Sequence, residues 1–83
     1  MKYAYVGLYT LTDAQRARDS LKRSKLRSIV VRMPSGPGVS CAYGVKLRQS
    51  DASEALRHLE AAGFHLGKTV YRSEGRVLDR DIL

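Results

Sequence analysis

The order of hydrophobic patterns along the chain constrains its fold more than any other feature of the sequence. Apolar and polar residues alternate over residues 3–9 and 42–48, and shorter apolar runs occupy residues 28–33 and 70–72. Both patterns are typical of β-strands. Residues 13–25, and the segment that follows Ser50 or Asp51, carry apolar residues at helical spacing instead. The predicted order is therefore strand, helix, strand, strand, helix, strand.

That order predicts an α+β fold, a ferredoxin-like βαββαβ two-layer sandwich in which two helices cover one face of a four-stranded antiparallel sheet. A chain of 83 residues is too short for two ordinary domains. We therefore expect one domain over residues 1–73 and a polar C-terminal tail over residues 74–83. The first strand should turn Ala4, Val6 and Leu8 toward the helices, and Tyr3, Tyr5 and Tyr9 toward an open face.

Local signals mark the ends of both helices. Thr12, with Asp13 and Gln15 after it, forms a capping-box pattern. Ser50 or Asp51 is expected to cap the second helix, and Gly63 suits the position just beyond its end. The expected buried stripes are Ala14, Ala17, Leu21 and Ser24 on the first helix, and Ala52, Ala55, Leu56, Leu59 and Ala62 on the second. A loop over residues 34–38 joins the two middle strands.

Positive charge is concentrated in the first part of the chain. The net charge is +7, and residues 1–48 hold ten Lys and Arg against two acidic residues. Most of this excess lies on the first helix and the turn after it: Arg16, Arg18, Lys22, Arg23, Lys25 and Arg27. Such a surface favours an anionic partner, either nucleic acid or an acidic protein. The alternative is a helix face that is simply solvated.

Several classes of function find no support in the sequence. No apolar run approaches the length of roughly 20 residues that spans a bilayer, and the N-terminus has no secretory pattern. We therefore expect a cytoplasmic protein without a membrane partner. Cys and His do not occur at zinc spacing, so no metal is expected. We also find no catalytic triad, carboxylate pair or cofactor fingerprint, which argues against a stand-alone enzyme with a bound cofactor.

The single cysteine, Cys41, is the main candidate for chemistry. In the predicted topology it lies at the end of the sheet where the first strand ends and the first helix begins. The residues Thr10, Thr12 and Asp13 should then be close to it, as should Ser40 and Gly38 in the preceding loop. Helix N-termini carry unpaired N–H groups that favour a thiolate. His65 should reach the same edge, where it would act as a base. Otherwise Cys41 is an inert buried residue.

The chain also resembles a known family, the selenium/sulfur carrier protein-like family. The resemblance lies in Met1-Lys2-Tyr3-Ala4-Tyr5-Val6-Gly7-Leu8-Tyr9, in Thr12-Asp13-Ala14, and in Ser40-Cys41-Ala42-Tyr43-Gly44-Val45-Lys46-Leu47. It covers residues 1–72. Ala42 departs from the family, which usually has Gly there. The resemblance implies that Cys41 carries sulfur or selenium as a persulfide or selenopersulfide and exchanges it with a donor or acceptor protein. A lone thiol suits this role, because a second Cys would discharge the cargo as a disulfide.

Two other functions remain open. An open sheet face with Tyr3, Tyr5 and Tyr9 could stack on the bases of RNA or single-stranded nucleic acid, with Lys46 and Arg48 near phosphates. No RNP1-like string supports this function. The same face could instead pair two copies of the chain as a homodimer.

Overall fold

The structure is a computed structural model, and it describes residues 2–34 and 41–73. Its elements follow in the order β1 (Lys2–Leu8), α1 (Leu11–Arg23), β2 (Ile29–Arg32), β3 (Tyr43–Arg48), a short 3-10 turn (Gln49–Asp51), α2 (Ala52–Ala61) and β4 (Leu66–Ser73). The predicted order of strands and helices is confirmed.

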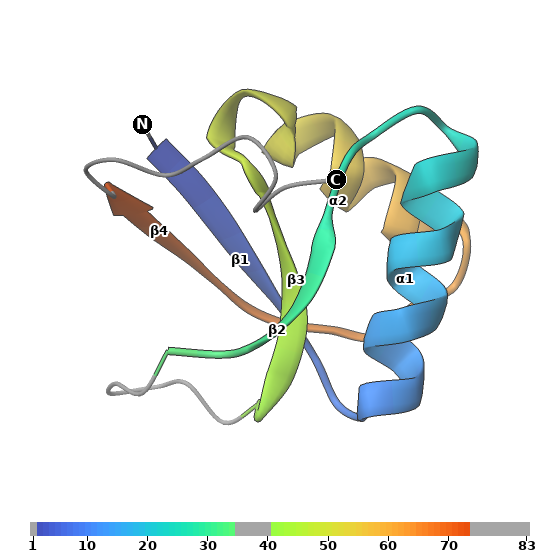
Figure 1. The fold of residues 1–83 in the computed structure, drawn as a ribbon. Coiled ribbons are helices and arrows are strands. Elements are labelled where there is room, and N and C mark those ends of the chain that lie inside the picture. The colour runs from blue at the N-terminus through green and yellow to red at the C-terminus, as the bar shows by residue number, and fades with distance from the viewer. Residues whose placement is uncertain (1, 35–40, 74–83) are drawn as a thin grey trace.

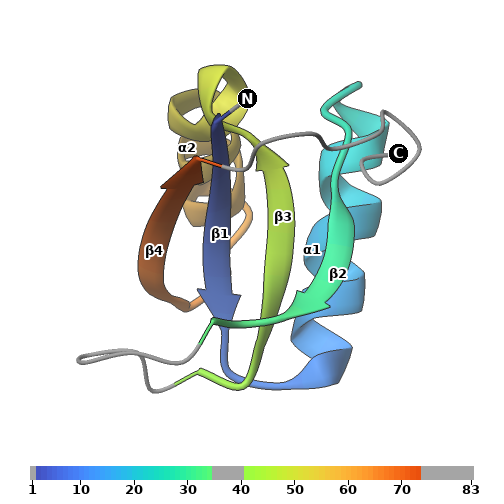
Figure 2. The ribbon, with the colours of Figure 1, turned by 60° about the vertical axis from the view of Figure 1, so that its left-hand side comes forward.

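The four strands form one sheet with the order β2-β3-β1-β4, in which all neighbours are antiparallel. The first strand, β1, is therefore central, and the last strand, β4, pairs with it at one edge of the sheet. Both helices pack on the same face (Figure 1). Figure 2 shows the sheet with its two helices behind it, and no described helix lies on the near face. The fold is an α+β two-layer sandwich of the ferredoxin-like kind.

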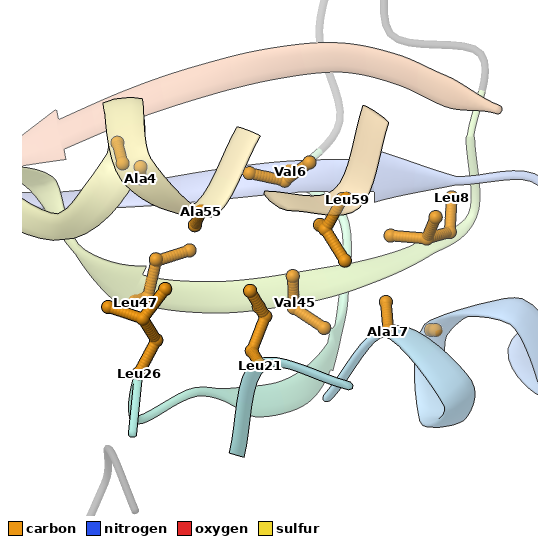
Figure 3. Packing of buried hydrophobic residues seen from close by; sticks show 12 residues of the cluster. Ala4, Val6, Leu8, Ala17, Leu21, Leu26, Val45, Leu47, Ala55 and Leu59 are labelled. Atoms are coloured by element: carbon orange, nitrogen blue, oxygen red, sulfur yellow. The ribbon is translucent and has the colours of Figure 1, made fainter. Parts of the chain in front are cut away.

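The main hydrophobic core fills the space between the sheet and the helices. Ala4, Val6 and Leu8 of β1 point into it, as the alternation of β1 predicts (Figure 3). The other strand and helix residues in the core are Val45 and Leu47 of β3, Ala14, Ala17 and Leu21 of α1, and Ala52, Ala55 and Leu59 of α2. Several of the helix residues are alanines, which allow the helices to approach the sheet closely.

A second buried cluster lies on the helix-free face and contradicts the expectation of an open tyrosine surface. Tyr3 is 1% exposed and Tyr5 is 7% exposed, and both pack with Met33 and Cys41. The ammonium of Lys46 lies 4.7 Å from the centre of the Tyr3 ring and 5.5 Å from that of Tyr5. Lys46 is itself only 8% exposed. Long side chains of this kind cover aromatic surface with their alkyl stems.

The N-terminal cap of α1 is Thr10, two residues before the predicted Thr12. The backbone N–H of Asp13 donates a hydrogen bond of 3.0 Å to Thr10 Oγ1. Thr10 has an extended backbone, so the helix can begin directly after it. At the C-terminal end of α2, Gly63 takes the position just beyond the helix, as predicted, with a left-handed φ of 89°. A side-chain-bearing residue, Lys25, takes the same left-handed conformation after α1, with a φ of 63°.

Three further details of the helices differ from the sequence prediction. Asp51, one of the two predicted capping residues, stands at the N-cap of α2, but its side chain makes no capping hydrogen bond, and the 3-10 turn leads directly into the helix. Ala62 is exposed at the end of α2. On α1 the buried serine is Ser20, whereas Ser24 is exposed at the C-cap. Ser24 follows the last helical residue, and the chain turns there.

Strand β4 is longer than the predicted residues 70–72. It begins at Leu66, opposite Leu8, and its pairing with β1 shifts between Val6 and Leu8. Such a bulge interrupts the alternation along a strand, which hides the strand from a period-two search. The other element bounds differ from the predictions by one or two residues. Most of the predicted loop over residues 34–38, and the predicted tail over residues 74–83, lie outside the described residues.

Candidate functional site

Cys41 lies just before β3, at the end of the sheet where β1 ends and β4 begins. Tyr43 pairs with Leu8, and Leu8 also pairs with Leu66. Pairing of this kind brings three strands together beside Cys41, as the topology predicts. The site is therefore assembled from segments that are far apart in the sequence.

The sulfur of Cys41 lies over strand backbone at two glycines. A Cβ added to Gly7 would lie 3.1 Å from the Cβ of Cys41 and 3.2 Å from its Sγ. A Cβ added to Gly67 would overlap the same Sγ. These glycines on β1 and β4 thus leave the space that the thiol fills. Cys41 is 7% exposed, so little of the residue is open to solvent.

The side chain of Met33, which follows β2, lies in a similar way over Gly44 of β3. A Cβ at Gly44 would overlap the Met33 sulfur, and it would also overlap backbone of Val6. The backbone N–H of Met33 donates a hydrogen bond of 2.8 Å to the carbonyl of Ala42. This bond ties the segment after β2 to the segment before β3. Glycines in neighbouring strands thus accommodate both sulfur-bearing residues of the second cluster.

The first turn of α1 belongs to the helix layer, whereas the sulfur lies on the opposite face of the sheet. Thr10 uses its hydroxyl as the helix cap, and Thr12 is exposed. Asp13 lines a hollow of about 190 Å³ together with His65 and residues of the α2–β4 turn. The recorded neighbours of Cys41 are the strand backbone at Gly7 and Gly67 and the side chains of the second cluster. Of the other predicted neighbours, Ser40 and Gly38 lie outside the described residues.

His65 lies at the predicted end of the molecule but on the helix side. It is exposed, and it shares its hollow with Asp13 and Arg16 of α1. Among the described residues, no hydrogen bond joins His65 to Cys41. The chain brings the two residues to one end, and the sheet places them in different layers.

His58 joins the two helices, a role that no motif in the sequence indicates. Its Nε2 lies 2.9 Å from the hydroxyl of Ser20, and its Nδ1 lies 3.1 Å from the hydroxyl of Ser24. These contacts join α2 to α1. Spacing could have indicated them, because Ser20 and Ser24 are four residues apart and so share one face of α1.

The residues of the predicted nucleic-acid face are not arranged for stacking. Tyr3 and Tyr5 are buried, and the ammonium of Lys46 lies over both rings. Tyr9 is 61% exposed but lies beyond the end of β1. Arg48 is exposed and lines a hollow of about 460 Å³ at the other end of the sheet, with Lys2, Gln49 and Ser50. Base stacking on Tyr3 and Tyr5 would first require their rings to be uncovered.

The described residues hold no group of three or more His, Cys, Asp or Glu that could bind a metal ion. Within the same residues, neither helix is both long enough and apolar enough to cross a membrane. We found no family model that matches the chain, and no curated protein or solved structure with significant similarity to it. The resemblance to selenium/sulfur carriers therefore depends on the residues quoted above.

Proposed function

We propose that this protein carries sulfur or selenium on Cys41 and exchanges it with a partner protein. The observation that supports the proposal is the space that Gly7 and Gly67 leave for the Cys41 sulfur. A carrier needs one thiol in a defined place, and Cys41 is the one cysteine of the chain. The proposal places the protein in a reducing cytoplasm, where a lone thiol stays free of disulfides.

The transfer itself requires no oxidant. The Cys41 thiolate attacks the outer sulfur of a persulfide on a donor, and the donor's sulfur–sulfur bond breaks. The donor leaves as a thiolate with the electron pair of that bond, and Cys41 becomes a persulfide. Delivery reverses these steps when an acceptor thiolate attacks the outer sulfur on Cys41. One sulfur atom moves between the proteins. The donor cysteine is reduced as Cys41 is oxidised, so the exchange needs no external oxidant or reductant.

The low exposure of Cys41 defines what the partner must do. At 7% exposure, the thiol is nearly closed to bulk solvent, so the donor has to bring its persulfide to a sulfur that is almost completely buried. Burial also protects a bound persulfide from other thiols. We therefore expect transfer from small or well-fitted donors and weak reaction with bulky reagents.

Intact-protein mass spectrometry tests the proposal directly. The reduced protein is incubated with a small-molecule persulfide donor, and its mass is recorded over time. We expect a gain of one sulfur atom that a reducing agent reverses, and no gain in Cys41→Ser. The control is the wild-type chain unfolded in urea, because it has the same thiol without the surrounding structure.

The comparison between folded and unfolded chain decides the outcome. A carrier site should take up sulfur from a small donor while folded, and it should hold the persulfide longer against added thiol than the unfolded chain does. A folded protein that takes up no sulfur, or that loses it as fast as the unfolded chain, would show that Cys41 is a packing residue.

A further inference from the structure

Helix α1 ends in a Schellman motif with a lysine at its left-handed position. The N–H of Lys25 donates to the carbonyl of Lys22 at 3.0 Å, and the N–H of Leu26 donates to the carbonyl of Leu21 at 2.9 Å. The φ of Lys25 is 63°. Residues with a Cβ rarely adopt this conformation, because the Cβ approaches the neighbouring carbonyl oxygen.

Helix α2 ends in the same motif with glycine in the equivalent place. The N–H of Gly63 donates to the carbonyl of Glu60, and the N–H of Phe64 donates to that of Leu59, both at 3.0 Å. The protein thus uses the favoured residue at one helix end and Lys25 at the other. A cation stabilises a helix C-terminus, but Lys22 and Arg23 already supply two in the last turn of α1. The position of Lys25 therefore suggests a use for its charge outside the helix.

Lys25 belongs to a continuous basic surface along α1 and the start of β2. Two hollows adjoin there and share Lys22 in their walls. One, of about 370 Å³, is lined by Lys22, Lys25, Leu26 and Arg27. The other, of about 230 Å³, is lined by Arg18, Lys22, Ser28 and Ile29. We define the α1–β2 basic surface as Arg18, Lys22, Lys25, Arg27 and Ser28.

Ser28 supplies an independent sign of a ligand at this surface. The residue is 3% exposed, and its hydroxyl has no hydrogen-bond partner among the described residues. A buried hydroxyl without a partner is destabilising. Ser28 lines the same hollow as Arg18 and Lys22. An anionic oxygen bound there could accept a hydrogen bond from its hydroxyl once that group turns toward the hollow. The nearby Asp19 is an exposed partner of Arg18 at 3.1 Å, and such surface pairs exchange readily.

The surroundings of the surface favour a nucleic acid over an acidic protein. Protein interfaces contain an apolar centre rich in aromatic side chains, whereas nucleic-acid interfaces are polar and positive. The large hydrophobic residues that are exposed in the described chain are Tyr9, Leu11 and Tyr71. None of them lines either hollow: Tyr9 and Leu11 lie at the opposite end of α1, and Tyr71 lies on β4, at the other edge of the sheet from β2.

We propose that the α1–β2 basic surface binds the phosphate backbone of a nucleic acid without reading its sequence. Arg18 and Lys22 lie one turn apart on α1, about 6 Å along its axis, and Lys25 extends the row just beyond the end of the helix. One nucleic-acid strand presents a phosphate about every 3.4 Å of helix axis, so this row can contact several phosphates. The surface does not include Cys41, and the proposal is independent of the carrier function.

Fluorescence anisotropy with a short labelled oligonucleotide tests binding, both as a single strand and as a duplex. Contacts to about four phosphates predict an affinity that falls about 100-fold between about 50 and about 200 mM salt. The oligonucleotide should bind regardless of base sequence. A labelled polyglutamate peptide of the same charge tests the acidic-protein alternative, and it should bind much more weakly. Cys41→Ser should bind like the wild type.

Two variants test the named residues without removing a stabilising contact. Lys25→Gly inserts the favoured residue at the left-handed position, and Ser28→Ala removes a hydroxyl that has no described partner. Each should fold at least as stably as the wild type, yet bind the oligonucleotide roughly fivefold more weakly. Lys25→Gly should also lower the salt slope by about one. The matched controls are Arg57→Gln and Ser53→Ala, at exposed positions of α2 outside this surface.

Three results would overturn the proposal. One is the absence of binding at low salt, and another is polyglutamate binding as tightly as the oligonucleotide. The third is an equal loss of affinity in Lys25→Gly and Arg57→Gln, since this would show that net charge alone, and not this surface, attracts the ligand.

Discussion

The Sγ of Cys41 occupies the space that Gly67 leaves by having no side chain. Gly67 lies on β4 and Cys41 just before β3, and a Cβ on Gly67 would overlap the sulfur. Gly67 has no positive φ, so glycine is not required there by backbone conformation. The close approach of the sulfur explains the glycine instead, and it couples the two positions energetically.

The coupling predicts a large difference between single and double variants. Gly67→Ala should destabilise the protein by about 1–3 kcal/mol, because the new methyl forces the thiol out of its place. In the Cys41→Ala background the same change should cost less than about 1 kcal/mol, since the remaining neighbours of the new Cβ lie at 3.4 and 3.6 Å. Urea unfolding of the four proteins measures the coupling. Additive effects would show that the sulfur is not held over Gly67.

The cap of α1 can be assigned by a matched pair of threonine variants. Thr10→Ala should lower the free energy of unfolding by about 1 kcal/mol, because it removes the acceptor for the Asp13 N–H. Thr12→Ala, at an exposed position two residues away, should change it by less than about 0.5 kcal/mol. Thermal or urea unfolding distinguishes them. A larger effect at Thr12 would restore the capping box that the sequence predicts.

Replacement of His58 should weaken the contact between the helices. His58→Ala removes the partner of the Ser20 hydroxyl, which is buried with its residue 6% exposed. We expect a loss of about 1–3 kcal/mol, since a buried hydroxyl would remain unpaired. Ser24→Ala should cost less, because Ser24 is exposed and water can replace its hydrogen bond. If both variants unfold at the same urea concentration as the wild type, the helices do not depend on this contact.

The left-handed position at the end of each helix should favour glycine over a residue that has a Cβ. The left-handed conformation of Lys25 costs about 1–2 kcal/mol, and Lys25→Gly removes this cost. The variant also loses the favourable interaction of a positive charge with the helix end, which contributes about 0.3–1 kcal/mol. The variant should therefore be as stable as the wild type or more stable. Gly63→Ala should destabilise by about 1 kcal/mol, because it places a Cβ at a φ of 89°. Equilibrium unfolding in urea measures both, and a clear loss of stability in Lys25→Gly would contradict the assignment.

Hydrophobic periodicity and the positions of glycines in the sequence predicted most of the architecture. Alternation in β1 identified which residues face the helices, and Ala4, Val6 and Leu8 lie in the core as expected. Gly63 marked the end of α2 correctly. These features depend on residues within one element, so the local pattern is sufficient to predict them. The bulge in β4 breaks its local pattern, and for that reason most of the strand was missed.

The candidate site depended on information that no local pattern contains. The topology predicted the end of the sheet at which Cys41 lies, but it did not predict the face or the glycines beneath the sulfur. Gly7 and Gly67 are 60 residues apart in the sequence, and they meet Cys41 only because β1 pairs with both β3 and β4. The contact between Ser20 and His58 spans 38 positions in the same way.

The sequence alone determined the order of the elements, the orientation of the strand faces and the concentration of positive charge near α1. Backbone periodicity and formal charge are properties of neighbouring residues, and they survive in any fold that keeps those elements. Only the tertiary structure decided that Tyr3 and Tyr5 are buried, that the Cys41 sulfur fills a space between strands, and that Ser28 lies beside Arg18 and Lys22. Those facts depend on strand register and on side-chain packing between distant segments, which are set when the whole chain folds.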